Sequence, residues 1–77
     1  MELIANQVVA MFRFDEYLIE VCREEDGWFA YLQKENYGIK MGMFGVPFDR
    51  SLEGFVDLVE SDIEEYIKIY EEEGYGS

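Results

Sequence analysis

The stretch 20-EVCREEDGWFAYL-32 carries the strongest local signal in this chain of 77 residues. The segment 20–23 and the aromatic-rich run at positions 28–32 flank a short acidic segment that includes Asp26 and Gly27. An Asp-Gly pair is typical of tight hairpin turns, because these turns need positive φ angles that glycine adopts without strain. The stretch therefore predicts a β-hairpin that turns at Asp26 and Gly27.

A second pair of strands is predicted on the N-terminal side of this turn. Residues 7–14, QVVAMFRF, and residues 17–22, YLIEVC, are both rich in the residue types that strands favour. Only the polar pair Asp15 and Glu16 separates them. We therefore expect two strands joined by a short turn, the second of which leads into the hairpin.

A further strand is predicted at residues 38–46, on the C-terminal side of the hairpin. Ile39, Met41 and Met43 occupy alternate positions and should face the core. The residues on the opposite face would be Gly38, Lys40 and Gly42. Glycines leave the backbone uncovered, which suits close approach by another element or by a partner's strand. Pro47 should end the strand, because proline cannot donate a backbone hydrogen bond.

The hydrophobic period changes from two to 3.6 between Ser51 and about Glu73, which predicts an amphipathic C-terminal helix. Its apolar positions are Leu52, Phe55, Val56, Val59, Ile63, Ile67 and Tyr70, bordered by Tyr66. Asp49 or Ser51 should cap the start of the helix, and Gly74 should end it. The chain is thus predicted to be one α+β domain, residues 1–77, with a mostly antiparallel sheet of three or four strands and the helix on one face.

The composition is strongly acidic. The chain has 18 Asp or Glu, six Lys or Arg and no His, which gives a formal net charge of −12. Hydrophobic residues still make up 49%, so the chain differs from a disordered acidic tail. Direct nucleic-acid binding is excluded, because six scattered cations do not form the basic groove that phosphates require. A basic protein, such as a nucleic-acid-binding enzyme or complex, is the partner that this charge favours.

Catalytic and metal-binding chemistry is not indicated. The single Cys22 excludes an internal disulfide and a cysteine-based zinc site, and we expect it to be a small buried hydrophobic residue in a strand. Glu24, Glu25 and Asp26 do not match the spacing of a calcium-binding loop. We therefore expect no enzyme activity, no cofactor and no metal site. The start of the chain lacks a signal-peptide pattern and no apolar run could span a membrane, so we expect a cytoplasmic protein without membrane contact.

The predicted helix supplies most of the candidate partner-binding residues. Half of the acids lie in this segment, with Lys68 as its lone cation. Carboxylates near a helix C-terminus face the negative end of the dipole, so they indicate either a frayed, solvated end or a patch selected for a partner. The aromatic residues exceed what one core face can hold, so some Tyr or Trp should be exposed as interface anchors. The candidate partner-binding residues are Asp57, Glu60, Glu64, Glu71, Glu72, Glu73 and Trp28.

Residues 17–73 resemble the HicB-like antitoxin domains. The resemblance is carried by the hairpin sequence 25-EDGWFAY-31, by 51-SLEGF-55 at the start of the helix and by 66-YIKIY-70 near its end. It covers about three quarters of the chain. It implies the element order of a β-hairpin, a strand and a helix, together with an antitoxin function.

The chain is also similar in type to small phage-encoded inhibitors such as anti-CRISPR proteins, DNA mimics and nuclease immunity proteins. This similarity lies in size, acidity and surplus aromatic residues. It implies a stoichiometric inhibitor whose carboxylates occlude a basic nucleic-acid-binding surface. The alternatives are a non-inhibitory interaction or assembly module and a HicB-like antitoxin. A homodimer is a further expectation, because residues 7–14 and 38–46 can both form sheet edges.

Overall fold

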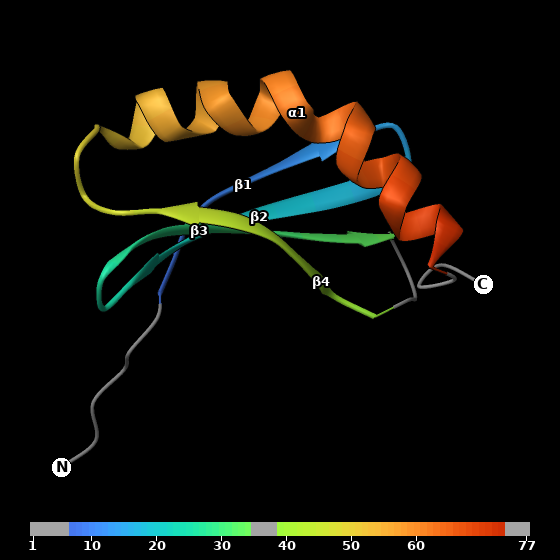
Figure 1. Ribbon diagram of the computed structural model, residues 1–77, viewed down its shortest axis with the longest axis horizontal. Helices are drawn as coiled ribbons and strands as arrows, with labels where there is room; N and C mark the ends of the chain where they lie inside the picture. Colours follow the sequence, from blue (N-terminus) through green and yellow to red (C-terminus); the bar gives the residue numbers. More distant parts are fainter. Residues whose placement is uncertain (1–6, 35–38, 74–77) are drawn as a thin grey trace, which may run out of the picture.

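The computed structural model describes residues 7–34 and 39–73. Its elements are β1 (Gln7–Phe14), β2 (Tyr17–Glu24), β3 (Gly27–Lys34), β4 (Met41–Val46) and α1 (Leu52–Glu72). The four strands form an antiparallel sheet in the order β1-β2-β3-β4, and α1 lies across one face of it (Figure 1). The predicted α+β class is confirmed.

The core lies between α1 and the sheet face that α1 covers. Alternate residues of β2 and β3 point toward the helix, as the period of two predicts. The buried cluster consists of Tyr17, Ile19, Val21, Ala30, Leu32, Met41, Met43, Phe55, Val59, Ile63 and Tyr70. Fully burying one large apolar side chain contributes roughly 1.5–3 kcal/mol. This apolar contact is therefore what fixes the helix on the sheet.

The predicted hairpin is confirmed, but its turn lies one residue earlier than predicted. The strand register pairs Glu24 with Gly27, so the turn consists of Glu25 and Asp26, neither of which has a positive φ. The prediction that Asp26 and Gly27 form the turn is wrong. Gly27 instead permits a close approach between strands, because a Cβ there would lie 2.1 Å from the carbonyl oxygen of Val46 in β4.

The strands before the hairpin follow the sequence prediction closely. β1 has the predicted bounds, and β2 continues two residues beyond Cys22. Asp15 and Glu16 form the turn between them, and Asp15 takes a φ of 54°, a left-handed conformation that aspartate tolerates better than most residues. Cys22 is buried in β2, as predicted.

β4 begins later than predicted. Its pairing with β3 starts at Leu32 and Met41, so Ile39 lies beyond the paired region and is 65% exposed. The prediction that Ile39 faces the core is wrong, whereas Met41 and Met43 are buried as predicted. Gly38 lies outside the described residues. β4 ends at Val46, directly before Pro47, as predicted.

The two glycines of β4 lie beside aromatic side chains of the neighbouring strand β3. A Cβ at Gly45 would lie 2.4 Å from the ring of Phe29, so the glycine makes room for an aromatic side chain from the neighbouring strand. At Gly42, where the sequence predicted a close approach, a Cβ would lie 3.8 Å from the ring of Tyr31, which is an ordinary contact distance. The register also shifts between Ala30 and Tyr31, which lets both Met43 and Phe44 contact the core.

The helix forms where the 3.6-residue period predicts it. Ser51 is the N-cap, and its Oγ accepts a hydrogen bond of 3.1 Å from the backbone N–H of Gly54. Asp49, the other predicted cap, instead pairs with Arg50. Glu73 is the C-cap, while the predicted stop at Gly74 falls outside the described residues.

Candidate functional site

The solvent side of α1 carries a row of carboxylates. The helix buries Phe55, Val59, Ile63 and Tyr70 against the sheet, so residues on the opposite side point into solvent. We call the exposed acids of α1 and its C-cap the acidic face. Its members are Glu53, Asp57, Glu60, Glu64, Glu65, Glu71, Glu72 and Glu73. All six acids that the sequence predicted as partner-binding residues lie on this face.

The acidic face has little compensating positive charge. Lys68 is the cation of α1, and it forms no salt bridge with any described residue. The salt bridges found among residues 7–34 and 39–73 lie elsewhere: Lys34 with Glu16, Lys40 with Glu20, and Arg50 with Asp49. Apart from Glu71, whose contact is described below, the carboxylates of the acidic face are therefore solvated charges, available to an external cation.

Glu71 differs from its neighbours because it also has a structural contact. The hydroxyl of Tyr17, at the start of β2, donates a hydrogen bond to the Glu71 carboxylate. Burial and this hydrogen bond both raise the pKa of Tyr17 well above its ordinary value, so the phenol stays neutral. Glu71 thus ties the end of the helix to the sheet, and its substitution would perturb the fold as well as the surface charge.

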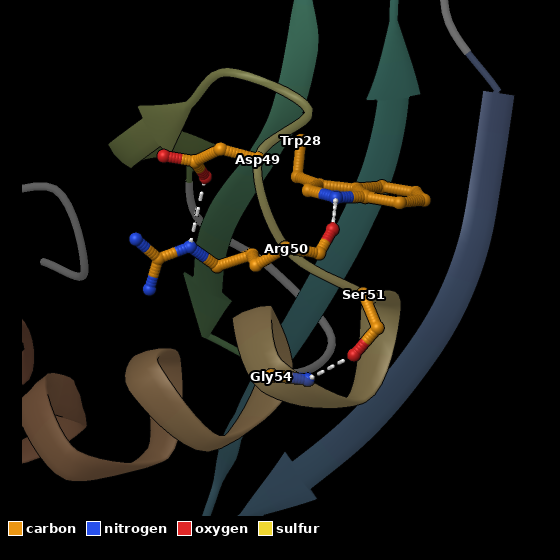
Figure 2. Close-up of polar contacts among 5 residues, drawn as sticks. All are labelled: Trp28, Asp49, Arg50, Ser51 and Gly54. Atoms are coloured by element: carbon orange, nitrogen blue, oxygen red, sulfur yellow. Dashed lines mark hydrogen bonds and ion pairs between the residues drawn. The ribbon is translucent and has the colours of Figure 1, made fainter.

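Trp28 belongs to β3, lies beside the N-terminal end of α1 and is half-buried. Figure 2 shows its indole Nε1 donating a hydrogen bond of 2.9 Å to the carbonyl oxygen of Arg50, in the segment that leads into α1. Its ring meets Phe48 edge-on with centroids 5.2 Å apart, and the Arg23 guanidinium lies 5.3 Å from the centroid of Phe48. Trp28 therefore joins β3 to the start of the helix.

The predicted partner-binding residues do not form one patch. Trp28 packs beside the N-terminal end of α1, whereas Glu71, Glu72 and Glu73 lie at its C-terminal end. The 21 residues of α1 separate these ends by roughly 30 Å. The expectation of an exposed Tyr or Trp is not met among the described residues, in which the exposed aromatic side chain is Phe48, at 45%. Tyr37 and Tyr75 lie outside that part of the chain.

The sequence prediction missed a hollow on the sheet face opposite α1. Its volume is about 270 Å³, and its lining residues are Gln7, Val8, Glu20, Cys22, Tyr31 and Lys40. Lys40 Nζ lies 2.7 Å from Glu20 Oε1, and the Tyr31 hydroxyl donates a hydrogen bond to Glu24. Alternation along β2 places Glu20, Cys22 and Glu24 on this face. This period of two is the sequence signal from which the residues of the hollow could have been grouped.

The hollow offers no reactive group. Burial, followed by the nearby charges of Glu20 and Glu24, raises the pKa of the Cys22 thiol, which keeps it protonated and unreactive. The polar groups of Glu20 and Lys40 already satisfy each other. Within the described part of the chain, no group of three Cys, Asp or Glu side chains is placed to hold a metal ion. No described helix has the length and apolar composition required to cross a membrane.

Comparison with known proteins identified no relative of this chain. No protein-family model, no curated protein and no solved structure matches it. The resemblances to HicB-like antitoxins and to small phage-encoded inhibitors therefore stay predictions.

Proposed function

We propose that this protein is a stoichiometric inhibitor that binds the basic nucleic-acid-binding surface of a partner protein through the acidic face of α1. The observation that carries the proposal is the set of exposed helix carboxylates without salt bridges among the described residues. A basic partner can form charge-assisted hydrogen bonds with these groups without first breaking internal ion pairs.

The charge density of the acidic face supports mimicry of a nucleic-acid strand. Its eight carboxylates extend from Glu53 to Glu73, about 30 Å at 1.5 Å per residue, which is roughly one charge every 4 Å. A single DNA strand carries one phosphate every 3.4 Å or so along the helix axis. A protein channel built for phosphates would therefore meet a similar linear charge density on α1.

The rigidity of α1 also favours this function. The helix is capped by Ser51 at its start, and buried side chains hold it against the sheet along its length. A partner therefore meets carboxylates whose backbone positions are already fixed, which lowers the entropy cost of binding. The net charge of −12 would steer a basic partner toward this surface, and electrostatic steering can raise association rates about 10- to 1,000-fold.

Capture of a partner from host lysate on the immobilised chain, followed by mass spectrometry, supplies the protein for the first test. The purified partner is then assayed for binding to duplex DNA or RNA with increasing amounts of this chain. We expect nucleic-acid binding to be lost as the molar ratio approaches one inhibitor per site. A partner that retains full nucleic-acid binding while bound to this chain would contradict inhibition and favour a non-inhibitory interaction module.

Charge reversal tests whether the acidic face forms the contact. The variant Glu60→Lys with Glu64→Lys changes two exposed helix acids and avoids Glu71, which contacts Tyr17. The control Glu25→Lys with Asp26→Lys makes the same change in net charge at the exposed β2–β3 turn. We expect the helix variant to associate at least about tenfold more slowly, with a weaker salt dependence than the control variant. Equal slowing by both variants would show that only net charge matters and would contradict a site on α1.

A further inference from the structure

The outer edge of β1 is open among the described residues. β1 pairs with β2 on one side, and the strand order places it at the end of the sheet. Its eight residues include no proline, no lysine and no acid, the residue types that commonly protect edge strands from pairing with another chain. Val8 and Met11, at 48% and 54% exposure, are among the most exposed large apolar side chains of the fold.

Apolar side chains also line the helix side of β1. Phe12 is paired with Ile19 and Phe14 with Tyr17, so both rings share the face on which α1 packs. They are only half-buried, whereas Ile19 and Tyr17 are at most 3% exposed. The helix therefore leaves the β1 side of this face incompletely covered. A strand added beside β1 would bury apolar surface on both faces of the sheet.

The opposite edge of the sheet is less suited to strand addition. Both edge strands have one register shift, in β1 between Val8 and Ala10 and between β3 and β4 at Ala30 and Tyr31. β4 is shorter, however, with six residues, two of which are glycines, whereas β1 has eight residues and no glycine. Pro47 directly follows its last residue. Phe44 of β4 also packs against two aromatic rings of α1, which places the helix over this side of the sheet. Strand addition is therefore favoured at β1 over β4.

We propose that β1 is a homodimer interface, in which β1 of one copy pairs antiparallel with β1 of a second copy. The charge distribution favours a second copy of this chain as the partner of β1. Two copies that each carry −12 repel one another, so their association is least opposed where carboxylates are absent. β1 carries one charged residue, Arg13, and its apolar edge is self-complementary under a two-fold axis. A basic partner would instead be drawn to the acids of α1.

Antiparallel pairing of two β1 strands would join the sheets into one continuous sheet of eight strands. The two-fold axis would run perpendicular to that sheet, so both α1 helices would lie on the same side of it. The dimer would then present two acidic faces in one direction. This proposal does not depend on inhibition of a nucleic-acid-binding protein, because it concerns only the association of this chain with itself.

Sedimentation equilibrium of the full chain at low and high salt tests the proposal. We expect a monomer–dimer equilibrium that tightens as salt rises, because salt screens the repulsion between two acidic copies. Binding of a basic partner should weaken with salt, so the two proposals fail in distinguishable ways. Sedimentation as a monomer at every protein and salt concentration would overturn the dimer proposal.

Matched variants locate the interface. Met11→Lys and, separately, Val8→Lys place a charge on the exposed face of β1, while Ile39→Lys makes the same change at an exposed residue before β4. Circular dichroism melting is used to choose the β1 variant that folds like the wild type. We expect this variant to raise the dimer dissociation constant at least about tenfold and Ile39→Lys to change it less than about twofold. An equal effect of both substitutions, or no effect at β1, would overturn the assignment.

Discussion

The two ends of α1 differ in how well their local sequence stabilises a helix. At the N-terminal end, Ser51 caps the helix through Gly54, and Glu53 lies in the first turn, where a carboxylate is favourable. At the C-terminal end, the last turn contains no basic residue, and the acids Glu71 and Glu72 face the negative end of the dipole. Local rules of helix formation therefore stabilise the start of α1 and oppose its end.

Tertiary contacts compensate at the C-terminal end. Tyr70 is fully buried, its hydroxyl accepts a hydrogen bond of 3.2 Å from the backbone N–H of Lys34, and its ring meets Tyr17 edge-on at 5.8 Å. Tyr17 in turn donates a hydrogen bond to Glu71. The comparison teaches that a helix end can carry unfavourable charges when buried aromatic residues from other elements hold it.

Large-to-small substitutions of buried aromatic residues in the two halves of α1 should have the largest effects on stability, and they test whether aromatic contacts hold the C-terminal end. We expect Phe55→Ala and Tyr70→Ala each to lower the free energy of unfolding by about 3–5 kcal/mol, because each leaves a cavity where a buried ring was. Total stability for a chain of this length is only about 4–12 kcal/mol, so both effects are large. Urea unfolding measures them. A loss below about 1 kcal/mol for Tyr70→Ala would show that the C-terminal end is not held by its aromatic contacts.

Alkaline pH should destabilise the fold, in part by ionising Tyr17, which contacts Glu71 at the C-terminal end of α1. Burial, then the hydrogen bond to Glu71, raises the pKa of Tyr17 above the ordinary value of 10.0, so the folded state binds this proton more tightly than the unfolded state. The resulting stabilisation is complete below about pH 10 and is lost as the pH rises toward the folded-state pKa. Tyr31 contributes similarly, since its hydrogen bond to Glu24 and its burial raise its pKa to about 12.

The measurement is the free energy of unfolding in urea at several pH values from about 8 to 12. We expect stability to fall above about pH 10 and the fall to be shallower in Tyr17→Phe and in Tyr31→Phe. The wild type serves as the reference for the full slope. An identical slope in the wild type and in both variants would contradict the assignment of the alkaline transition to these phenols.

Removal of a single hydrogen bond at either end of α1 should lower the free energy of unfolding by a smaller amount, similar at the two ends. Ser51→Ala removes the N-cap and should cost about 1 kcal/mol, within a usual range of about 0.5–2 kcal/mol. Tyr17→Phe removes the hydrogen bond to Glu71 and should lower the free energy of unfolding at neutral pH by about 0.5–1.5 kcal/mol. Thermal or urea unfolding of both variants measures the difference. A destabilisation by Ser51→Ala alone would sharpen the contrast between the ends, because it would leave only apolar packing at the C-terminal end.

Charge reversals should give the smallest effects and opposite signs. Glu53→Lys should destabilise the fold and Glu72→Lys should stabilise it, each by about 0.3–1 kcal/mol at low salt, since the helix dipole has opposite signs at its two ends. Both reversals should weaken binding to a basic partner. Stability measured at low and high salt tests this prediction, and effects of the same sign for both variants would contradict it.

The outcome of sequence-based prediction depended on which interactions a residue makes. The bounds of β1 and the helix and the burial of Cys22 follow from local patterns and were predicted, and Ser51 was one of the two predicted caps. The position of the hairpin turn was missed, because Gly27 responds to the nearby backbone of Val46 in β4 and not to the turn itself. The half-buried position of Trp28 likewise depends on a carbonyl 22 residues away.

The sequence by itself determined the α+β class and the acidic outer face of α1, because these follow from hydrophobic period and charge pattern. Tertiary structure alone decided which strands became edges, how far α1 covers the sheet and which acids acquire structural contacts. Glu71 and Glu72 are adjacent and chemically identical in the sequence, yet only Glu71 receives a hydrogen bond from Tyr17 among the described residues. The physical reason is that this contact joins residues 54 positions apart, which only the packing of α1 on the sheet brings together.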